Sequence, residues 1–339
     1  MNEEAPQDDE APLVGIEAVR AAAERLRGIA LRTPLVAFGR PEAGHWLKAE
    51  SLQPIGAFKL RGAYNAIALL SAAERGRGVI TYSSGNHAQG VARAARLLAT
   101  PAVVVMPSDA PRIKRQRVEA DGAQVVIVGT ASDERQAVAE RIAADRGLAI
   151  IPPYDDDRII AGQGTVGLEI AEDLPDVAAV LVPIGGGGLA SGVALAVKAL
   201  RPSCRIIGVE PELAADARAS LTTGEIVRWD ADLVSRTVAD GTRTQALGTR
   251  TFAHLRRYLD GIVTVSEAEI VDGVRLIAER ARLVAEPSGA LTAAALVHLA
   301  GDPLLDGLAG LDGPVVAIVS GGNVDPEAYR AYLETPALD

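Results

Sequence analysis

The sequence predicts an α/β fold built from open parallel sheets with helices on both faces. Runs such as 103–105, 125–128 and 315–319 are apolar on consecutive residues, as in strands that helices cover on both sides. Helical stretches at 132–146 and 267–284 fill the gaps between such runs. The 339 residues include 34 glycines and only 3% aromatic residues, a composition that suits tight strand-to-helix turns.

The first expected helix covers residues 16–26, where Ile16, Val19 and Leu26 recur at helical spacing. Eight short β-rich runs follow and are expected to be strands: 79–82, 102–106, 125–128, 149–151, 179–184, 205–209, 262–265 and 315–319.

The best candidate boundary is the turn-rich stretch 152–157, which contains two prolines, a tyrosine and three aspartates. Prolines end a strand and cannot continue a helix, and the three aspartates suggest a solvated turn. We therefore expect two open parallel-sheet domains: a small mobile one at 63–154, and a large one formed by 13–62 together with 155–339.

The charge distribution excludes several classes of protein. The net charge of −10 argues against a general nucleic-acid binder. Half of it lies in residues 1–12, which we expect to form a disordered acidic tail and not a signal peptide. The single Cys204 cannot form an internal disulfide, and the apolar runs are too short to cross a membrane. These features predict a cytoplasmic protein.

Lys59 is the first candidate for a chemically reactive residue. It follows the Pro54 and Gly56 turn and starts an expected helix. The partial positive charge of a helix N-terminus lowers the pKa of an amine and favours its neutral, nucleophilic form. Position alone leaves open the alternative of a solvated surface lysine.

Two further segments follow strands and are typical of anion sites. Residues 83–90 combine small residues and an asparagine at a helix start, which suits a carboxylate or phosphate; a plain helix cap is the alternative. The four glycines 185–188 suit close approach of backbone to a phosphate, or else form a flexible loop. They lack the GxGxxG spacing with a downstream ribose acid, so a dinucleotide site is weakly supported.

Residues 320–323 place the Ser320 hydroxyl at the end of the last buried strand, where ligands of α/β proteins bind; a simple turn is the alternative. Together, the segments favour a ligand with a phosphate, a lysine-reactive aldehyde and a neighbouring carboxylate. Pyridoxal 5'-phosphate (PLP), bound to Lys59 as a Schiff base with an amino acid beside it, meets these requirements.

Several motifs in a fixed order make the sequence resemble the serine/threonine dehydratase (threonine ammonia-lyase) and serine racemase family. These are fold-type II PLP-dependent enzymes with a tryptophan synthase β-like fold. The matching segments run nearly end to end: 32–35, 56–63, 83–87, 161–165, 185–188, 286–290 and 320–323.

The resemblance implies a cofactor cleft between the two domains, the large one binding the cofactor, and assigns residue roles. Lys59 would form the Schiff base and remove the Cα proton, with Phe58 beside the cofactor ring. Asn86 would bond the phenolic oxygen of the ring, and Ser320 would face its pyridine nitrogen. The phosphate would bind Gly185, Gly186, Gly187 and Gly188, and the substrate carboxylate would bind Ser83, Ser84, Gly85, Asn86 and His87.

The Ser320 assignment indicates a reaction type. A neutral hydroxyl does not keep the pyridine nitrogen protonated as a carboxylate would, so the electron sink is weaker and elimination is favoured over transamination. The hypothesis is therefore a lyase of amino acid metabolism. It would convert L-threonine and/or L-serine to 2-oxobutyrate or pyruvate plus ammonia.

Other activities remain open at this point. In the family, racemases carry serine at the position of Ser84, opposite the lysine, and racemisation needs one acid/base group on each face. Serine-bearing members also include 3-hydroxyaspartate dehydratases, for which Arg135 could meet the second carboxylate. A PLP-binding regulatory protein without turnover, a β-replacement enzyme and a nicotinamide oxidoreductase are weaker alternatives.

Glu210 follows an expected strand, with Ala214 and Asp216 four and six residues further on. Two carboxylates and a carbonyl suit an oxygen-ligated Mg²⁺, or Mn²⁺ or Ca²⁺, and the family places a structural or activating ion at the matching residues. A solvated acidic turn is the alternative.

The resemblance also implies a homodimer. The chain ends 16 residues after Asn323, so we expect no C-terminal regulatory domain and no isoleucine feedback through one.

Overall fold

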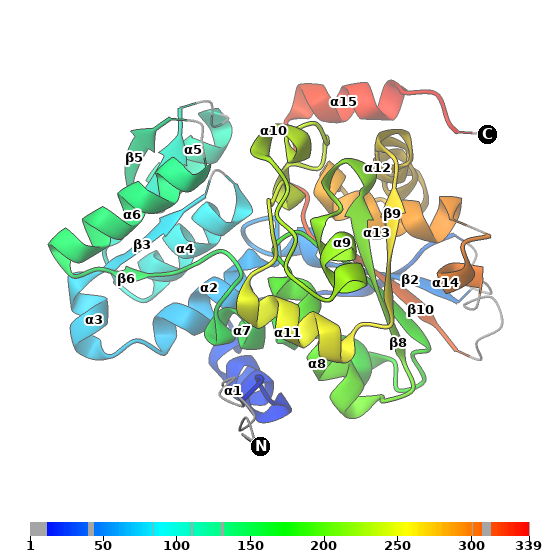
Figure 1. Ribbon diagram of the computed structural model, residues 1–339, viewed down its shortest axis with the longest axis horizontal. Coiled ribbons are helices and arrows are strands. Elements are labelled where there is room, and N and C mark those ends of the chain that lie inside the picture. Colours follow the sequence, from blue (N-terminus) through cyan, green and yellow to red (C-terminus); the bar gives the residue numbers. More distant parts are fainter. Residues whose placement is uncertain are drawn as a thin grey trace, which may run out of the picture.

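Two lobes, each built around one sheet, make up the protein (Figure 1). The structure is a computed structural model that describes residues 12–39, 44–83, 85–108, 110, 112–129, 132–299, 301–306 and 313–338. The acidic tail at residues 1–11 and Ser84 therefore lie outside the described residues.

The larger lobe contains a six-stranded sheet with the strand order β1-β2-β10-β7-β8-β9. All neighbouring pairs are parallel except β1 and β2. The helices α12 (Glu267–Ala281) and α13 (Pro287–His298) cover one face, and α7 (Asp157–Asp173), α8 (Gly188–Leu200) and α11 (Thr249–Tyr258) cover the other, each over a core of apolar side chains. The strands are β1 (Leu35–Ala37), β2 (His45–Ala49), β7 (Ala179–Pro183), β8 (Arg205–Pro211), β9 (Gly261–Val265) and β10 (Val315–Val319).

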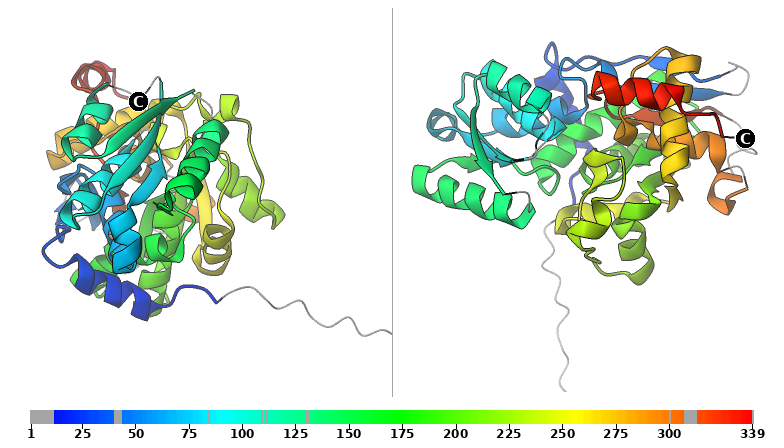
Figure 2. Two further views of the ribbon diagram at one scale, coloured as in Figure 1. Left: turned by 90° about the vertical axis from the view of Figure 1, so that its left-hand side faces the viewer. Right: turned by 90° about the horizontal axis from the view of Figure 1, so that it is seen from above.

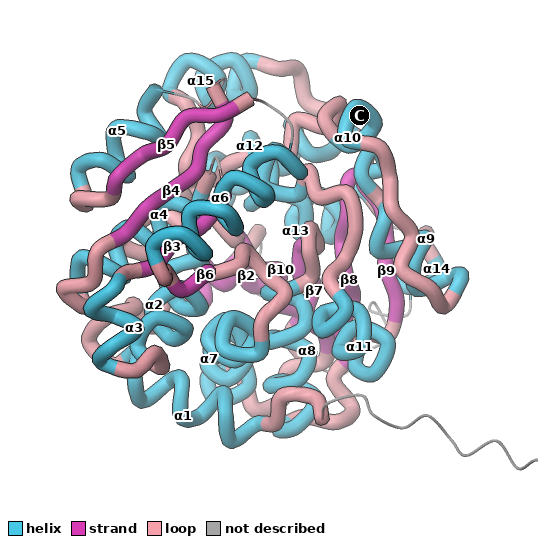
Figure 3. The backbone as a smooth tube through the Cα atoms, turned by 60° about the vertical axis from the view of Figure 1, so that its left-hand side comes forward, coloured by secondary structure: helices cyan, strands magenta, loops and turns pink. Residues whose placement is uncertain are grey.

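The smaller lobe contains a four-stranded parallel sheet with the order β5-β4-β3-β6 (Figure 3). Helices α2, α4 and α5 pack on one face and α6 on the other. The strands are β3 (Val79–Tyr82), β4 (Ala102–Pro107), β5 (Gln124–Val128) and β6 (Ala149–Ile150). The helices are α2 (Lys59–Ala68), α3 (Ala72–Arg77), α4 (Asn86–Leu97), α5 (Arg112–Ala120) and α6 (Ser132–Arg146).

The remaining helices complete the larger lobe, with α1 against α7 and α8, as the two views of Figure 2 show from other sides. No helix among the described residues is long and apolar enough to cross a membrane. These elements are α1 (Ile16–Leu26), η2 (Glu50–Leu52), α7 (Asp157–Asp173), α8 (Gly188–Leu200), η3 (Glu212–Ala214), α9 (Asp216–Thr223), α10 (Ala231–Val234), η4 (Asp240–Thr242), α11 (Thr249–Tyr258), α12 (Glu267–Ala281), α13 (Pro287–His298), α14 (Pro303–Asp306) and α15 (Pro326–Glu334).

Most of the fold agrees with the pattern of the sequence. All eight expected strands are present, each within two residues of its expected ends. Strands β1 and β2 were not predicted from the sequence. The β2 strand lacks a continuous apolar run because the fully buried Lys48 lies within it, paired with Glu169 at 2.6 Å. Helix α12 ends three residues early because Arg282 adopts a left-handed conformation with φ of 60°.

The α7 helix joins the two lobes. Its first turn contributes Ile159 to the core of the smaller lobe, whereas Val166 and Ile170 lie in the core of the larger one. It crosses α2 so closely that a Cβ atom on Gly162 would lie 2.6 Å from the Cα atom of Gly62. The division of the chain at residues 63 and 154 stays a prediction, because α7 belongs to both cores.

Candidate active site

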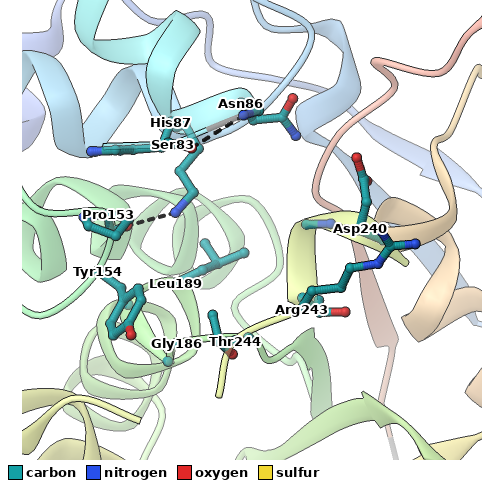
Figure 4. A pocket seen from close by; sticks show the side chains of 18 of the residues that line it. Ser83, Asn86, His87, Pro153, Tyr154, Gly186, Leu189, Asp240, Arg243 and Thr244 are labelled. Atoms are coloured by element: carbon teal, nitrogen blue, oxygen red, sulfur yellow. Dashed lines mark hydrogen bonds between the residues drawn. The ribbon is translucent and has the colours of Figure 1, made fainter. Parts of the chain in front are cut away.

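A cleft of about 250 Å³ lies where residues that follow three parallel strands come together. Ser83 follows β3 of the smaller sheet, whereas Gly185 and Ser320 follow β7 and β10 of the larger one. Figure 4 shows side chains that line this cleft. The carboxyl ends of strands are the usual ligand edge of open parallel sheets.

Lys59 begins α2 at the base of the cleft. The preceding residue is held against the end of β10, because the Phe58 N–H donates to the carbonyl oxygen of Ser320 at 3.1 Å and Ala57 forms a β-bridge with Gly321. The Lys59 Nζ atom donates to the carbonyl oxygen of Pro153 at 2.7 Å, drawn dashed in Figure 4. The lysine therefore lies within the cleft and is not a solvated surface residue.

Burial lowers the pKa of Lys59 to about 8. The direction agrees with the sequence analysis, but the cause is desolvation of the ammonium and not the helix terminus. Burial, with a contribution from Lys59, also lowers the pKa of His87 to about 3, so its imidazole is neutral. The His87 Nε2–H donates to the carbonyl oxygen of Ile151 at 3.0 Å, which leaves Nδ1 buried without a partner among the described residues.

The loop expected to receive a carboxylate lies at the N-terminus of α4. The Ser83 hydroxyl accepts a hydrogen bond from the Gly85 N–H at 3.3 Å, and Asn86 is the first helical residue. Ser83, Gly85, Asn86 and His87 all line the cleft. The fifth member of the predicted set, Ser84, lies outside the described residues.

The side chain of Asn86 is held from two sides. Its Nδ2 donates to Glu286 Oε1 at 2.5 Å, and its Oδ1 accepts from Asn323 Nδ2 at 2.9 Å. These two bonds define which way the amide faces. Burial and the nearby carboxylate of Asp240 raise the pKa of Glu286 to about 7. The sequence analysis did not assign Glu286 a role, although it lies in the recognised 286–290 segment.

The glycine loop between β7 and α8 presents free donors. Among the hydrogen bonds between described residues, none uses the N–H of Gly185, Gly186, Gly187 or Gly188 as a donor. The loop ends at the N-terminus of a 13-residue helix, where the backbone dipoles favour an anion. A phosphate-sized group fits this donor set.

The reason for glycine in this loop differs in part from the expectation. A Cβ atom on Gly186 would lie 2.2 Å from the Tyr154 ring, and one on Gly187 would lie 2.9 Å from Thr251. Gly187 also has a φ of 90°, which L side chains rarely adopt. The missing side chains thus leave room for other parts of the protein, and the N–H groups remain available to a ligand.

Ser320 is buried at the end of β10, and its hydroxyl donates to the carbonyl oxygen of Ser288 at 3.3 Å.

The cleft also contains groups that were not predicted from the sequence. Lys114 of α5 and Asp240 of η4 form an ion pair at 2.5 Å, and the Thr244 hydroxyl is buried without a described partner. No local pattern marks these residues, because long-range packing brings them to the cleft.

The predicted metal ligands form a separate buried site. Glu210, at the end of β8, accepts hydrogen bonds from the N–H groups of Ala217 and Arg218 at 3.0 and 2.8 Å. Both carboxylate oxygens of Asp216 are buried without a described partner. Burial raises the pKa of Asp216 to about 7, and burial plus the charge of Asp216 raises that of Glu210 well above its usual value. No cluster of three or more His, Cys, Asp or Glu side chains that could hold a metal ion is found among the described residues.

The sequence predicted a solvated turn at 155–157. In the structure, its three aspartates also contact other parts of the chain. Asp155 accepts hydrogen bonds from the backbone of Arg250 at 2.9 Å and Thr251 at 3.1 Å, at the start of α11. Asp156 caps α7 through the Arg158 N–H at 2.7 Å, and Asp157 pairs with the Arg250 side chain at 2.8 Å. Asp155 and Asp156 therefore cap the starts of α11 and α7, and the ion pair of Asp157 links these two helices.

The chain belongs to the family of pyridoxal-phosphate dependent enzymes, whose pattern it matches over residues 26–321. This family, and the α/β fold with parallel sheets, agree with the resemblance found in the sequence. The family match decides against the nicotinamide alternative. The partly buried Lys59 and the free donors of the glycine loop fit an aldehyde cofactor that carries a phosphate.

Curated relatives with three different names are about equally similar to the chain. An L-threo-3-hydroxyaspartate ammonia-lyase from a Pseudomonas species is 43% identical, with 92% of this chain and 96% of the relative covered. The serine racemase of Schizosaccharomyces pombe is 40% identical, with 93% and 96% covered. The L-threonine ammonia-lyase of Thermotoga maritima is 43% identical, with 92% and 76% covered.

Solved structures agree with the fold. The maize serine racemase superimposes with a TM-score of 0.88 at 36% identity, with 94% of this chain and 97% of that chain covered. A threonine deaminase from the organism abbreviated T.th. has a TM-score of 0.83 at 43% identity, with 92% and 99% covered.

Proposed function

We propose that the protein is a PLP-dependent ammonia-lyase of β-hydroxy amino acids, in which the β-hydroxyl leaves as water and the resulting enamine is then hydrolysed, taking up one water and releasing ammonia. The substrates would be L-threonine and/or L-serine, and the products 2-oxobutyrate or pyruvate plus ammonia. The observation that carries the proposal is the joint placement of three features in one cleft. These are the partly buried Lys59 amine, the four free N–H groups of the glycine loop and the neutral Ser320 hydroxyl.

The residues of the chain would divide the work by position. Lys59 would carry the cofactor and act as the base at the substrate Cα, since a pKa near 8 leaves part of the amine neutral at physiological pH. The N–H groups of Gly185–Gly188 would bind the phosphate, with Phe58 beside the cofactor ring. When bound, PLP supplies the electron sink that stabilises the carbanion left by proton removal.

Two further contacts would set the balance of reactions. Asn86, oriented by Glu286 and Asn323, has a second amide hydrogen that would reach the phenolic oxygen of the cofactor. Ser320 would face the pyridine nitrogen as a neutral partner, which favours elimination. The substrate carboxylate would bind the N-terminal end of α4, at Ser83, Ser84, Gly85, Asn86 and His87, where the helix dipole is positive.

We also propose that Glu210, Asp216 and the carbonyl of Ala214 hold Mg²⁺, or Mn²⁺ or Ca²⁺. Two buried carboxylates in mutual repulsion, one without any described hydrogen-bond partner, are costly unless a cation or a proton neutralises them. Oxygen ligands of this kind suit hard divalent ions. The ion would stabilise the segment between β8 and α9 and take no part in the chemistry.

Two alternative substrate assignments have specific support. Arg135 lines the cleft and would pair with the second carboxylate of L-threo-3-hydroxyaspartate, the substrate in the name of the Pseudomonas relative. Ser84 would supply the second acid/base group that a serine racemase needs.

The chain would also be homodimeric and cytoplasmic. The resemblance supports the homodimer, and the single buried Cys204 is compatible with a cytoplasmic protein.

One reaction series distinguishes these activities. Purified protein with PLP and Mg²⁺ would be offered L-serine, L-threonine and L-threo-3-hydroxyaspartate in separate tubes, and 2-oxo acid and D-isomer would be quantified. We expect 2-oxo acid to dominate from threonine or serine. D-Serine at or above the level of pyruvate would identify a racemase, and oxaloacetate as the main product would identify a hydroxyaspartate lyase.

A further inference from the structure

The crossover segment, defined here as Pro153, Tyr154 and Asp155, contacts two parts of the cofactor cleft and the start of the neighbouring helix α11. It connects β6 of the smaller lobe to α7, whose later turns lie in the core of the larger lobe. Its first contact is with the lysine, because the carbonyl oxygen of Pro153 accepts the hydrogen bond of Lys59 Nζ at 2.7 Å.

Tyr154 makes the second contact, with the glycine loop (Figure 4). A Cβ atom on Gly186 would lie 2.2 to 2.3 Å from three carbon atoms of the Tyr154 ring, so the ring lies directly against the backbone at this residue. A Cβ atom on Gly188 would lie 3.1 Å from the Tyr154 Cα atom. One residue of the crossover segment therefore covers two of the four glycines.

The phenol of Tyr154 ties the ring to another wall of the cleft. Its hydroxyl donates to the carbonyl oxygen of Ala246 at 3.3 Å. The stretch 242–246 also backs the glycine loop, since a Cβ atom on Gly185 would lie 3.1 Å from the Thr242 Cα atom. A phenol is protonated and able to donate at neutral pH, and burial raises the pKa of Tyr154 further, to about 12.

Asp155 makes the third contact, with α11. Its Oδ1 accepts hydrogen bonds from the N–H groups of Arg250 and Thr251. The Thr251 hydroxyl in turn donates to the carbonyl oxygen of Gly186 at 2.8 Å. The same glycine is thus held on one side by the Tyr154 ring and on the other by a threonine whose helix start Asp155 caps.

We propose that Tyr154 is a positioning residue for the cofactor phosphate. Its ring holds the glycine loop in the shape that leaves the four N–H groups free for the phosphate. The crossover segment thereby sets how tightly the cofactor is retained, in addition to the donors of the loop. Tyr154 acts through the backbone of the loop and needs no direct contact with the reacting atoms.

The test compares the binding of two aldehydes to cofactor-free protein, PLP and pyridoxal, which lacks the phosphate. The variants are Tyr154→Ala and Tyr154→Phe, with Tyr329→Ala as the control, because Tyr329 is a partly buried tyrosine of α15 that packs on the larger-lobe core. Absorbance titration gives the dissociation constant of each aldehyde, and thermal unfolding gives the stability of each variant.

For Tyr154→Ala we expect the dissociation constant of PLP to rise at least about tenfold, while that of pyridoxal changes less than about threefold. Tyr154→Phe keeps the ring and should stay within about threefold of wild type for both aldehydes. Tyr329→Ala should lower the unfolding temperature and leave both dissociation constants unchanged.

Unchanged PLP affinity in a folded Tyr154→Ala variant would overturn the proposal. Equal losses for PLP and pyridoxal would also overturn it, because a general loosening of the cleft does not act through the phosphate. If Tyr154→Ala does not fold, Tyr154→Leu replaces it, since leucine fills part of the ring volume without covering Gly186 fully. The same selective loss for PLP is then expected, in smaller degree, and its absence counts against Tyr154.

Discussion

The Nζ atom of Lys59 donates a hydrogen bond to the carbonyl oxygen of Pro153, and no described carboxylate pairs with it. A carbonyl stabilises the ammonium less than a carboxylate would, so burial is not offset by an opposite charge. The pKa of Lys59 therefore falls to about 8. A partly buried lysine whose neutral form is accessible near physiological pH is suited to imine formation and to proton transfer.

Replacement of Lys59 by alanine should abolish both covalent attachment of the cofactor and turnover. The reason is that no other described lysine lines the cleft except Lys114, which is paired with Asp240. Borohydride reduction followed by mass spectrometry should show a PLP adduct on wild type and none on Lys59→Ala. Retained turnover, or an adduct on another lysine, would refute the assignment.

The rate of PLP capture by cofactor-free protein should rise with pH and level off above about 8. The neutral amine is the nucleophile, and a pKa lowered from 10.5 to about 8 makes it the main form above that value. Stopped-flow absorbance between about pH 6.5 and pH 10 would follow this. A rate that continues to rise to pH 10 would mean that Lys59 titrates like an exposed lysine.

Local patterns were enough to predict eight of the ten described strands and the residues that follow them. Consecutive apolar runs mark β4 and β10 because helices cover both of their faces. The same expectation was wrong for residues 125–128, because β5 is the edge strand of its sheet and Ile127 is 43% exposed. Lys59 and Gly185–Gly188 were identifiable because their signals are contiguous in sequence. The β2 strand was missed because its buried Lys48 depends on Glu169, which lies 121 residues away.

The parts of the cleft that the sequence did not reveal all depend on long-range packing. Tyr154 lies in a segment that looked like a simple domain boundary, and its contacts with Gly186 and Ala246 come from distant elements. Glu286 matters through Asn86, which is 200 residues away in sequence. A single sequence contains no local periodicity that would bring such pairs together.

Addition of Mg²⁺ should raise the unfolding temperature of chelator-treated protein by about 2–5 °C. The ion would neutralise the buried carboxylates of Glu210 and Asp216. Differential scanning fluorimetry with and without chelator measures the shift. Asp216→Asn should lose the response, and Glu212→Gln, which removes an exposed carboxylate of η3, should keep it. No shift in wild type would leave these residues as a protonated pair.

Ser84→Ala should suppress the formation of D-isomer while sparing elimination from L-substrates. The lysine serves one face of the substrate Cα in the proposed reaction, and racemisation requires a second acid/base group on the other face. Chiral chromatography of D-serine and a coupled assay of pyruvate measure the two products in one reaction. Equal losses of both activities would assign Ser84 to the carboxylate-binding loop.

Arg135→Gln should lower kcat/KM for one substrate far more than for the other. If Arg135 meets a second carboxylate, kcat/KM for L-threo-3-hydroxyaspartate should fall about 10- to 100-fold, since a charge-assisted hydrogen bond is lost. The value for L-threonine should change less than about threefold, because its methyl group makes no such bond. The matched control is Arg141→Gln, which removes a charge from the same helix at a residue that is not part of the cleft lining. Steady-state kinetics give kcat/KM for both substrates. Equal changes for the two would mean that Arg135 maintains the shape of the cleft and does not bind the second carboxylate, so that the residues around Asp240 would determine the choice of substrate.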